Sequence, residues 1–173
     1  MTNQHINYNN VSPEEHFTLL CKEMYNLCME QGWGDPFSYA VSREILIANK
    51  LGHKKAPDYS GADGIDQDGG CEYKSTINKN INGAYNGVSV QPTWERQEDY
   101  LREEKIGKYK NHYIVRFGDG EIVECYRLDG SKVLELLLPK FKKSYSNTLS
   151  KKDPRLGASL TKKEIYAYGE KLI

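Results

Sequence analysis

The pattern of apolar and polar positions along the chain predicts a mixture of helices and strands. Apolar side chains recur at helical spacing between Ser12, which begins a capping box, and Gly32, and this first helix is expected to pack on the core. Residues 113–117 alternate as strands do, and a Gly-Asp-Gly turn at 118–120 joins them to a second strand over 121–128. The expected fold class is therefore α/β.

Shorter signals complete the predicted set of elements. Asp35 followed by Pro36 is a typical helix start, and Leu51-Gly52 is a typical end. A Leu-rich helix is predicted from Ser131, and Pro139 is expected to end or kink it. The remaining predictions are a strand over residues 88–91, a helix from Pro92-Thr93 to about Lys108 and a short helix after a capping box at Thr161.

The segment 61–76 predicts a hairpin that carries two carboxylates and a lysine. Residues 61–65 can extend as a strand, 66–70 are rich in Asp and Gly as turns are, and 71–76 resume an alternating pattern. Alternation places Glu72 and Lys74 on one face of the second strand. Folding back at the turn brings Asp63 within cross-strand reach of both side chains.

These residue types suit hydrolysis of a phosphodiester. Two carboxylates supply the hard oxygen ligands that Mg²⁺ prefers and leave positions open for water and a phosphate oxygen. An adjacent lysine can orient or help to deprotonate the attacking water and offset the charge that grows on phosphorus. The alternative for Asp63, Glu72 and Lys74 is an exposed hairpin with an ordinary cross-strand ion pair.

The hairpin resembles the PD-(D/E)xK nucleases, and among them the type II restriction endonucleases. The pattern of an acid, a short hairpin and then acid-any-Lys is present as Asp63 followed by Glu72-Tyr73-Lys74. A literal Pro-Asp also occurs at Pro57-Asp58, so Asp58 or Asp63 could be the first metal ligand, and Asp63 is favoured because it lies on the strand. The resemblance implies a restriction-endonuclease-like mixed central sheet flanked by helices, Mg²⁺ as cofactor and a homodimer that cuts double-stranded DNA.

Glu44 is a further candidate for the metal site. It falls in the middle of the apolar arc of the helix predicted before the hairpin, where an unpaired carboxylate would be costly. In the family that the hairpin resembles, such a helix often lends an acidic residue to the metal, which makes Glu44 a candidate catalytic residue and ligand. The alternative is a carboxylate that reaches the rim or pairs with a core Lys or Arg.

Net charge does not by itself indicate a nucleic-acid-binding protein, because 24 basic and 24 acidic residues balance. Contact with DNA is therefore expected from local segments. An amide-rich loop follows Lys74, and amides and glycines suit contacts with base edges, although they also form ordinary turns. A basic stretch near the end of the chain suits phosphate contacts, or is simply a solvated surface. The candidate DNA-binding residues are Asn78, Lys79, Asn80, Asn82, Tyr85, Asn86, Lys142, Lys143, Lys151, Lys152 and Arg155.

The chain of 173 residues is expected to form a single domain over 1–173, with 1–11 flexible. Four cysteines without metal-ligand spacing read as thiols in a reducing cytosol, so a cytoplasmic protein is predicted, with no membrane partner. Two other functions stay open: a structure-specific nuclease such as a Holliday-junction resolvase, and a non-catalytic DNA-binding module.

Overall fold

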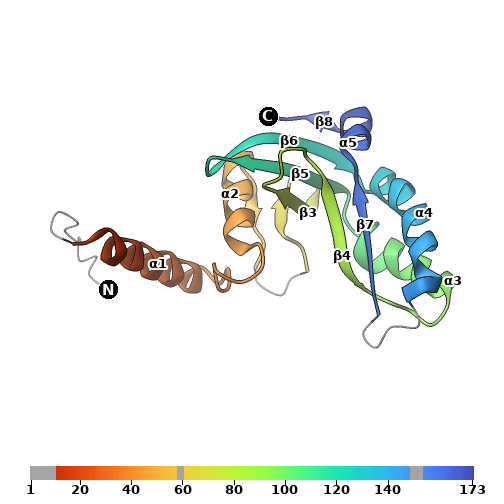
Figure 1. Cartoon of the computed structure of the whole chain (residues 1–173), viewed down its shortest axis with the longest axis horizontal. Coiled ribbons are helices and arrows are strands. Elements are labelled where there is room, and N and C mark those ends of the chain that lie inside the picture. Colours follow the sequence, from red (N-terminus) through yellow and green to blue (C-terminus); the bar gives the residue numbers. More distant parts are fainter. Residues whose placement is uncertain (1–10, 58–60, 149–153) are drawn as a thin grey trace.

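A mixed sheet forms the centre of the molecule (Figure 1). The computed structural model describes residues 11–57, 61–148 and 154–173. Of the segment 1–11, expected to be flexible, only Val11 belongs to the described part. β3 and β5 are parallel, and the other neighbouring strands are antiparallel. The order across the sheet is β1 (Lys54–Lys55), β2 (Gly64–Asp66), β3 (Gly69–Thr76), β5 (Asn111–Gly118), β6 (Glu121–Asp129) and β8 (Glu170–Lys171).

The two faces of the sheet bury two different clusters. On one face α2 (Val41–Leu51) packs Ile47 and Ala48 against alternate residues of β3 and β5, among them Tyr73 and Tyr113. On the other face a β4–β7 ribbon, three α-helices and a π-helix bury a larger cluster of apolar side chains. These elements are β4 (Gly83–Ser89), α3 (Trp94–Tyr100), the π-helix η2 (Leu101–Lys105), α4 (Gly130–Thr148), β7 (Arg155–Leu160) and α5 (Lys162–Tyr168). This is the α/β architecture that the sequence predicted.

The first helix, α1 (Pro13–Glu30), projects away from the sheet (Figure 1). Its capping box at Ser12 forms as predicted. Its predicted packing on the core is wrong: among the described side chains of α1 only Cys28 is buried, whereas Phe17 is 68 % exposed and Leu27 is 51 % exposed. The apolar spacing therefore predicts the helix correctly, but it does not show whether the apolar side of the helix packs on the core.

Three predicted boundaries are corrected. α2 begins at Val41 rather than after Asp35, because residues 36–40 form turns in which Asp35 caps the Phe37 N–H. The strand predicted at 88–91 begins earlier, at Gly83, so half of the amide-rich loop is strand β4. α4 runs through Pro139, because Leu137 and Phe141 on either side are fully buried in the core.

All four cysteines are free thiols, three of them buried. Within the described ranges, no helix is long and apolar enough to cross a lipid bilayer.

Candidate functional site

The β2–β3 hairpin is held against β5 by its own acidic turn. Gln67 and Asp68 form the turn. The Asn111 amide donates to Asp66 at 2.9 Å and to Asp68 at 3.0 Å, and the Tyr113 hydroxyl donates to Asp66 at 2.9 Å. Because Asp66 and Asp68 are used in this way, they fix the hairpin and stay separate from the carboxylates of the site.

Asp63 was expected on the first strand of the hairpin, but it lies just before β2, and it points its side chain at β3. The Tyr73 N–H donates to Asp63 Oδ2 at 2.7 Å, and the Asp63 N–H donates to the Cys71 carbonyl at 3.0 Å. Burial, reinforced by repulsion from Glu72, raises the pKa of Asp63 to about 6. A carboxylate with a raised pKa is one that a cation would stabilise.

Glu72 and Lys74 point to the same face of β3, as strand alternation predicted. The Lys74 ammonium donates to Glu72 Oε1 and, at 3.3 Å, to the Tyr73 carbonyl. The lysine side chain is 23 % exposed and the glutamate 18 %. Burial acts to lower the pKa of Lys74, but attraction to Glu72 and Asp63 outweighs it, so the pKa is raised. Lys74 is therefore a cation held between two carboxylates.

The three side chains line one pocket of about 290 Å³. The opposite wall comes from η2 and the loop after it, together with β4. In η2 the hydrogen bonds shift by one residue, with the Ile106 N–H donating to the Leu101 carbonyl at 2.9 Å. π-helical turns of this kind are often found at functional sites. Here the turn brings Lys105 and, just beyond it, Lys108 to the same pocket as Asp63 and Glu72.

Glu44 lies beside the carboxylates but is engaged elsewhere. Its carboxylate pairs with Lys55 at 3.2 Å, and both side chains are largely buried. Burial, followed by repulsion from Asp63, raises its pKa. The pairing with a buried lysine is the alternative that the sequence left open, and Glu44 does not line the pocket. Its role as a metal ligand remains a prediction.

The donor set of the pocket matches Mg²⁺ more closely than metals that need a protein cage. Across residues 11–57, 61–148 and 154–173, no group of three or more His, Cys, Asp or Glu side chains is arranged to hold a metal ion. Mg²⁺ commonly binds through one or two carboxylates and completes its coordination with water and substrate phosphate. Asp63 and Glu72 supply such a pair of hard oxygen ligands, and their mutual repulsion is only partly offset by Lys74 and Lys55. The alternative first ligand, Asp58, lies outside the described residues.

The predicted DNA-contacting loop divides into two parts. Asn78, Lys79 and Asn80 are exposed in the turn after β3, and Asn82 follows before β4. Asn86 is exposed on β4 and lines the pocket. Tyr85 is 5 % exposed, and its hydroxyl bonds His112, so its ring lies inside the pocket wall and is closed to contact with bases.

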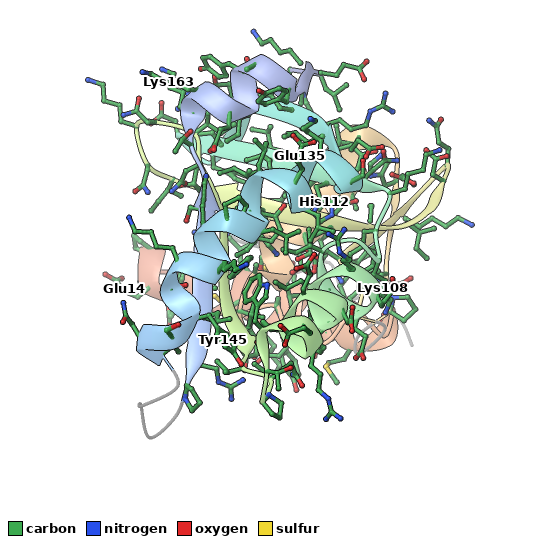
Figure 2. All side chains as sticks on the ribbon, turned by 90° about the vertical axis from the view of Figure 1, so that its right-hand side faces the viewer. Glu14, Lys108, His112, Glu135, Tyr145 and Lys163 are labelled. Atoms are coloured by element: carbon green, nitrogen blue, oxygen red, sulfur yellow. The ribbon has the colours of Figure 1, made fainter. Side chains whose placement is uncertain are left out.

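The described residues of the predicted basic stretch are spread over several elements and do not line the pocket. Lys142 lies over the ring of Trp94 at 5.7 Å, and Lys143 is exposed on α4. Arg155 donates to the Ser89 hydroxyl at 3.0 Å. In Figure 2, Lys163 lies at the upper left and Lys108 at the right, below the middle of the view. The predicted Lys151 and Lys152 lie outside the described residues.

Sequence reasoning missed five charged or polar side chains of the pocket: Glu104, Lys105, Lys108, Tyr109 and His112. A helix from Pro92-Thr93 to about Lys108 was predicted, but the sequence does not show which of its charged side chains face the pocket. His112 directly precedes the predicted strand 113–117. Strand alternation puts His112 on the same face as Ile114 and on the opposite face from Tyr113. This was the available signal that His112 faces the same side of the sheet as Glu72.

Neither a scan against models of protein families nor a search of curated proteins found a match for this chain.

Proposed function

We propose that the protein is a Mg²⁺-dependent endonuclease that cuts double-stranded DNA at specific sites, as type II restriction enzymes do. One observation carries the proposal: Asp63, Glu72 and Lys74 converge in a pocket whose other wall offers Lys105 and Lys108. The carboxylates that line the pocket, Asp63, Glu72 and Glu104, would by themselves repel a phosphodiester. With a divalent cation and three lysines, the same pocket attracts it.

The roles of the side chains follow from their chemistry. Asp63 and Glu72 would hold Mg²⁺, which when bound supplies a Lewis acid for the phosphate oxygen and a more acidic water. Lys74, fixed by Glu72 and the Tyr73 carbonyl, can orient the attacking water and offset charge on the phosphorus centre. Lys105 and Lys108 can hold the flanking phosphates.

The predicted type of sheet, the homodimer and the cytoplasmic location belong to the same proposal. The hairpin followed by the parallel β3–β5 pair, with α2 behind it, supports a restriction-endonuclease-like sheet. A homodimer is part of the proposal through the family resemblance, because cutting both strands of a palindrome needs two copies of one site related by a two-fold axis. A DNA substrate and free thiols favour the cytoplasm.

The test of the function is incubation of supercoiled plasmid with the purified chain, with and without Mg²⁺. We expect discrete fragments that appear only with Mg²⁺ and are abolished by chelation. Cleavage of branched DNA alone would favour a junction resolvase, and binding without cleavage would favour the DNA-binding module. Sequencing the ends of the fragments would then read out the recognition site.

Cleavage is expected to rise with pH across the titration of Asp63. Its pKa of about 6 means that most molecules carry a neutral, weakly coordinating carboxyl below that pH and an ionised ligand above it. Because Mg²⁺ binds the ionised form, more Mg²⁺ should move the midpoint to lower pH. Single-turnover rates between pH 5 and 8 at two Mg²⁺ concentrations measure this. A pH midpoint that stays the same at both Mg²⁺ concentrations would show that Asp63 is not a metal ligand.

The lysines of the pocket wall are expected to contribute to DNA affinity. Replacing both Lys105 and Lys108 with alanine should reduce the slope of log affinity against log salt by about 2. The double variant Lys142→Ala/Lys143→Ala tests the stretch predicted from sequence, and Lys50→Ala, at an exposed position of α2 outside the pocket, is a control for charge. Binding measured in Ca²⁺, across a salt series, separates them. An unchanged slope for the first pair would place the DNA elsewhere.

A further inference from the structure

A buried chain of contacts runs from η2 to the catalytic lysine. The Ile106 carbonyl, just after η2, lies 3.0 Å from His112 Nε2, and His112 Nδ1 lies 2.9 Å from the Tyr85 hydroxyl. His112 is fully buried and Tyr85 is 5 % exposed. On the other side of the Tyr85 ring, the Lys74 ammonium lies 5.2 Å from its centroid.

The direction of each hydrogen bond follows from its acceptor. A carbonyl can only accept, so His112 Nε2 carries the proton and donates to Ile106. Burial lowers the pKa of His112 to about 4, so the ring is neutral and Nδ1 is an acceptor. The Tyr85 hydroxyl therefore donates to Nδ1. This assignment leaves Tyr85 anchored at its hydroxyl, with its ring fixed in orientation.

The fixed ring presents a π face to Lys74. An ammonium over an aromatic face is attracted by the ring quadrupole, most strongly where water is excluded. The ammonium also donates to Glu72 and to the Tyr73 carbonyl, so the ring adds a third constraint. Lysine has four rotatable side-chain bonds, and its position in the pocket depends on such constraints.

We propose that Tyr85 is a positioning residue, which holds the Lys74 ammonium in its reactive place through the face of its ring, with His112 fixing the orientation of that ring. The catalytic consequence rests on the proposed nuclease function, but the contact itself does not. Tyr85 would thus act through Lys74, while Lys74 meets the substrate.

The test weakens the ring face while keeping the hydroxyl and its bond to His112. The wild type is compared with protein that carries mono-, di- and trifluorinated tyrosine at position 85, which weakens the π face in steps. We expect kcat to fall stepwise by about tenfold over the series, with DNA affinity and KM unchanged. The matched control is the exposed Tyr168, whose ring lies 5.1 Å from Lys132. The same series at Tyr168 should leave kcat unchanged. A flat series at Tyr85 would overturn the proposal.

A second measurement needs neither activity nor a Tyr85 variant. In protein labelled with ¹³C-lysine, the Cε protons of Lys74 should resonate upfield because the Tyr85 ring lies beneath them, with Lys74→Arg identifying the signal. An unshifted signal would overturn the contact. If the wild type cuts no DNA, the proposed function fails, while this shift still decides whether Tyr85 holds Lys74. If the wild type cuts and the fluorinated series is flat, only the inference fails.

Discussion

Replacing Lys74 with alanine is expected to reduce Mg²⁺-dependent cleavage by on the order of 10³-fold. Lys74 is the cation that lies between Asp63 and Glu72, and it donates directly to Glu72. Its removal takes away the group that orients the water and offsets charge in the transition state. Single-turnover cleavage at saturating Mg²⁺ measures the loss, and DNA binding in Ca²⁺ should change little.

The same change should also lower the stability of the metal-free protein. Without Lys74, the repulsion between Asp63 and Glu72 loses its largest compensating charge, so the metal-free variant should unfold at lower urea concentration than the wild type. Mg²⁺ should restore most of that difference, since the cation takes over the compensation. Asp68→Asn is the matched control, because it removes a charge from the same hairpin outside the pocket. Full cleavage by Lys74→Ala would refute the assigned site.

Local sequence signals predicted the part of the site that depends on local geometry. The Asp- and Gly-rich turn and the alternation after it were sufficient to place Glu72 and Lys74 on one face, and the β5–β6 hairpin followed from Gly118-Asp119-Gly120 for the same reason. Capping boxes located the starts of α1 and α5. In each case the residues that decide the structure are neighbours in the chain.

The opposite wall of the pocket could not be predicted, because it depends on contacts between distant segments. β4 is strand because it pairs with β7, and its register shifts between Tyr85 and Val88, where Gly87 has a φ of +74°. Asn-Gly alone indicated a turn there. Likewise, nothing local shows that a π-helix will turn Lys105 and Lys108 toward Glu72.

Replacing Asp63 with asparagine is expected to abolish Mg²⁺-dependent cleavage and, in the absence of Mg²⁺, to stabilise the fold. Asparagine keeps an oxygen that can accept from the Tyr73 N–H, as Asp63 Oδ2 does at 2.7 Å. It removes a charge that is costly here: burial and Glu72 raise the pKa of Asp63 from 3.8 to about 6. Cleavage is lost because a neutral amide is a poor replacement for an anionic ligand of Mg²⁺.

The sign of the stability change follows from proton binding. Since the folded protein holds the Asp63 proton more tightly than the unfolded chain does, the wild type is destabilised by this group as pH rises from about 4 to about 6, and the cost is complete above that range. At pH 7 in chelator, Asp63→Asn should therefore be more stable by about 1–3 kcal/mol in urea unfolding. At pH 4 the two proteins should be nearly equal. At pH 7, added Mg²⁺ should stabilise the wild type more than the variant. A variant that is less stable than the wild type at pH 7 in chelator would mean that Lys74 compensates Asp63 fully, and that Asp63 is a structural carboxylate.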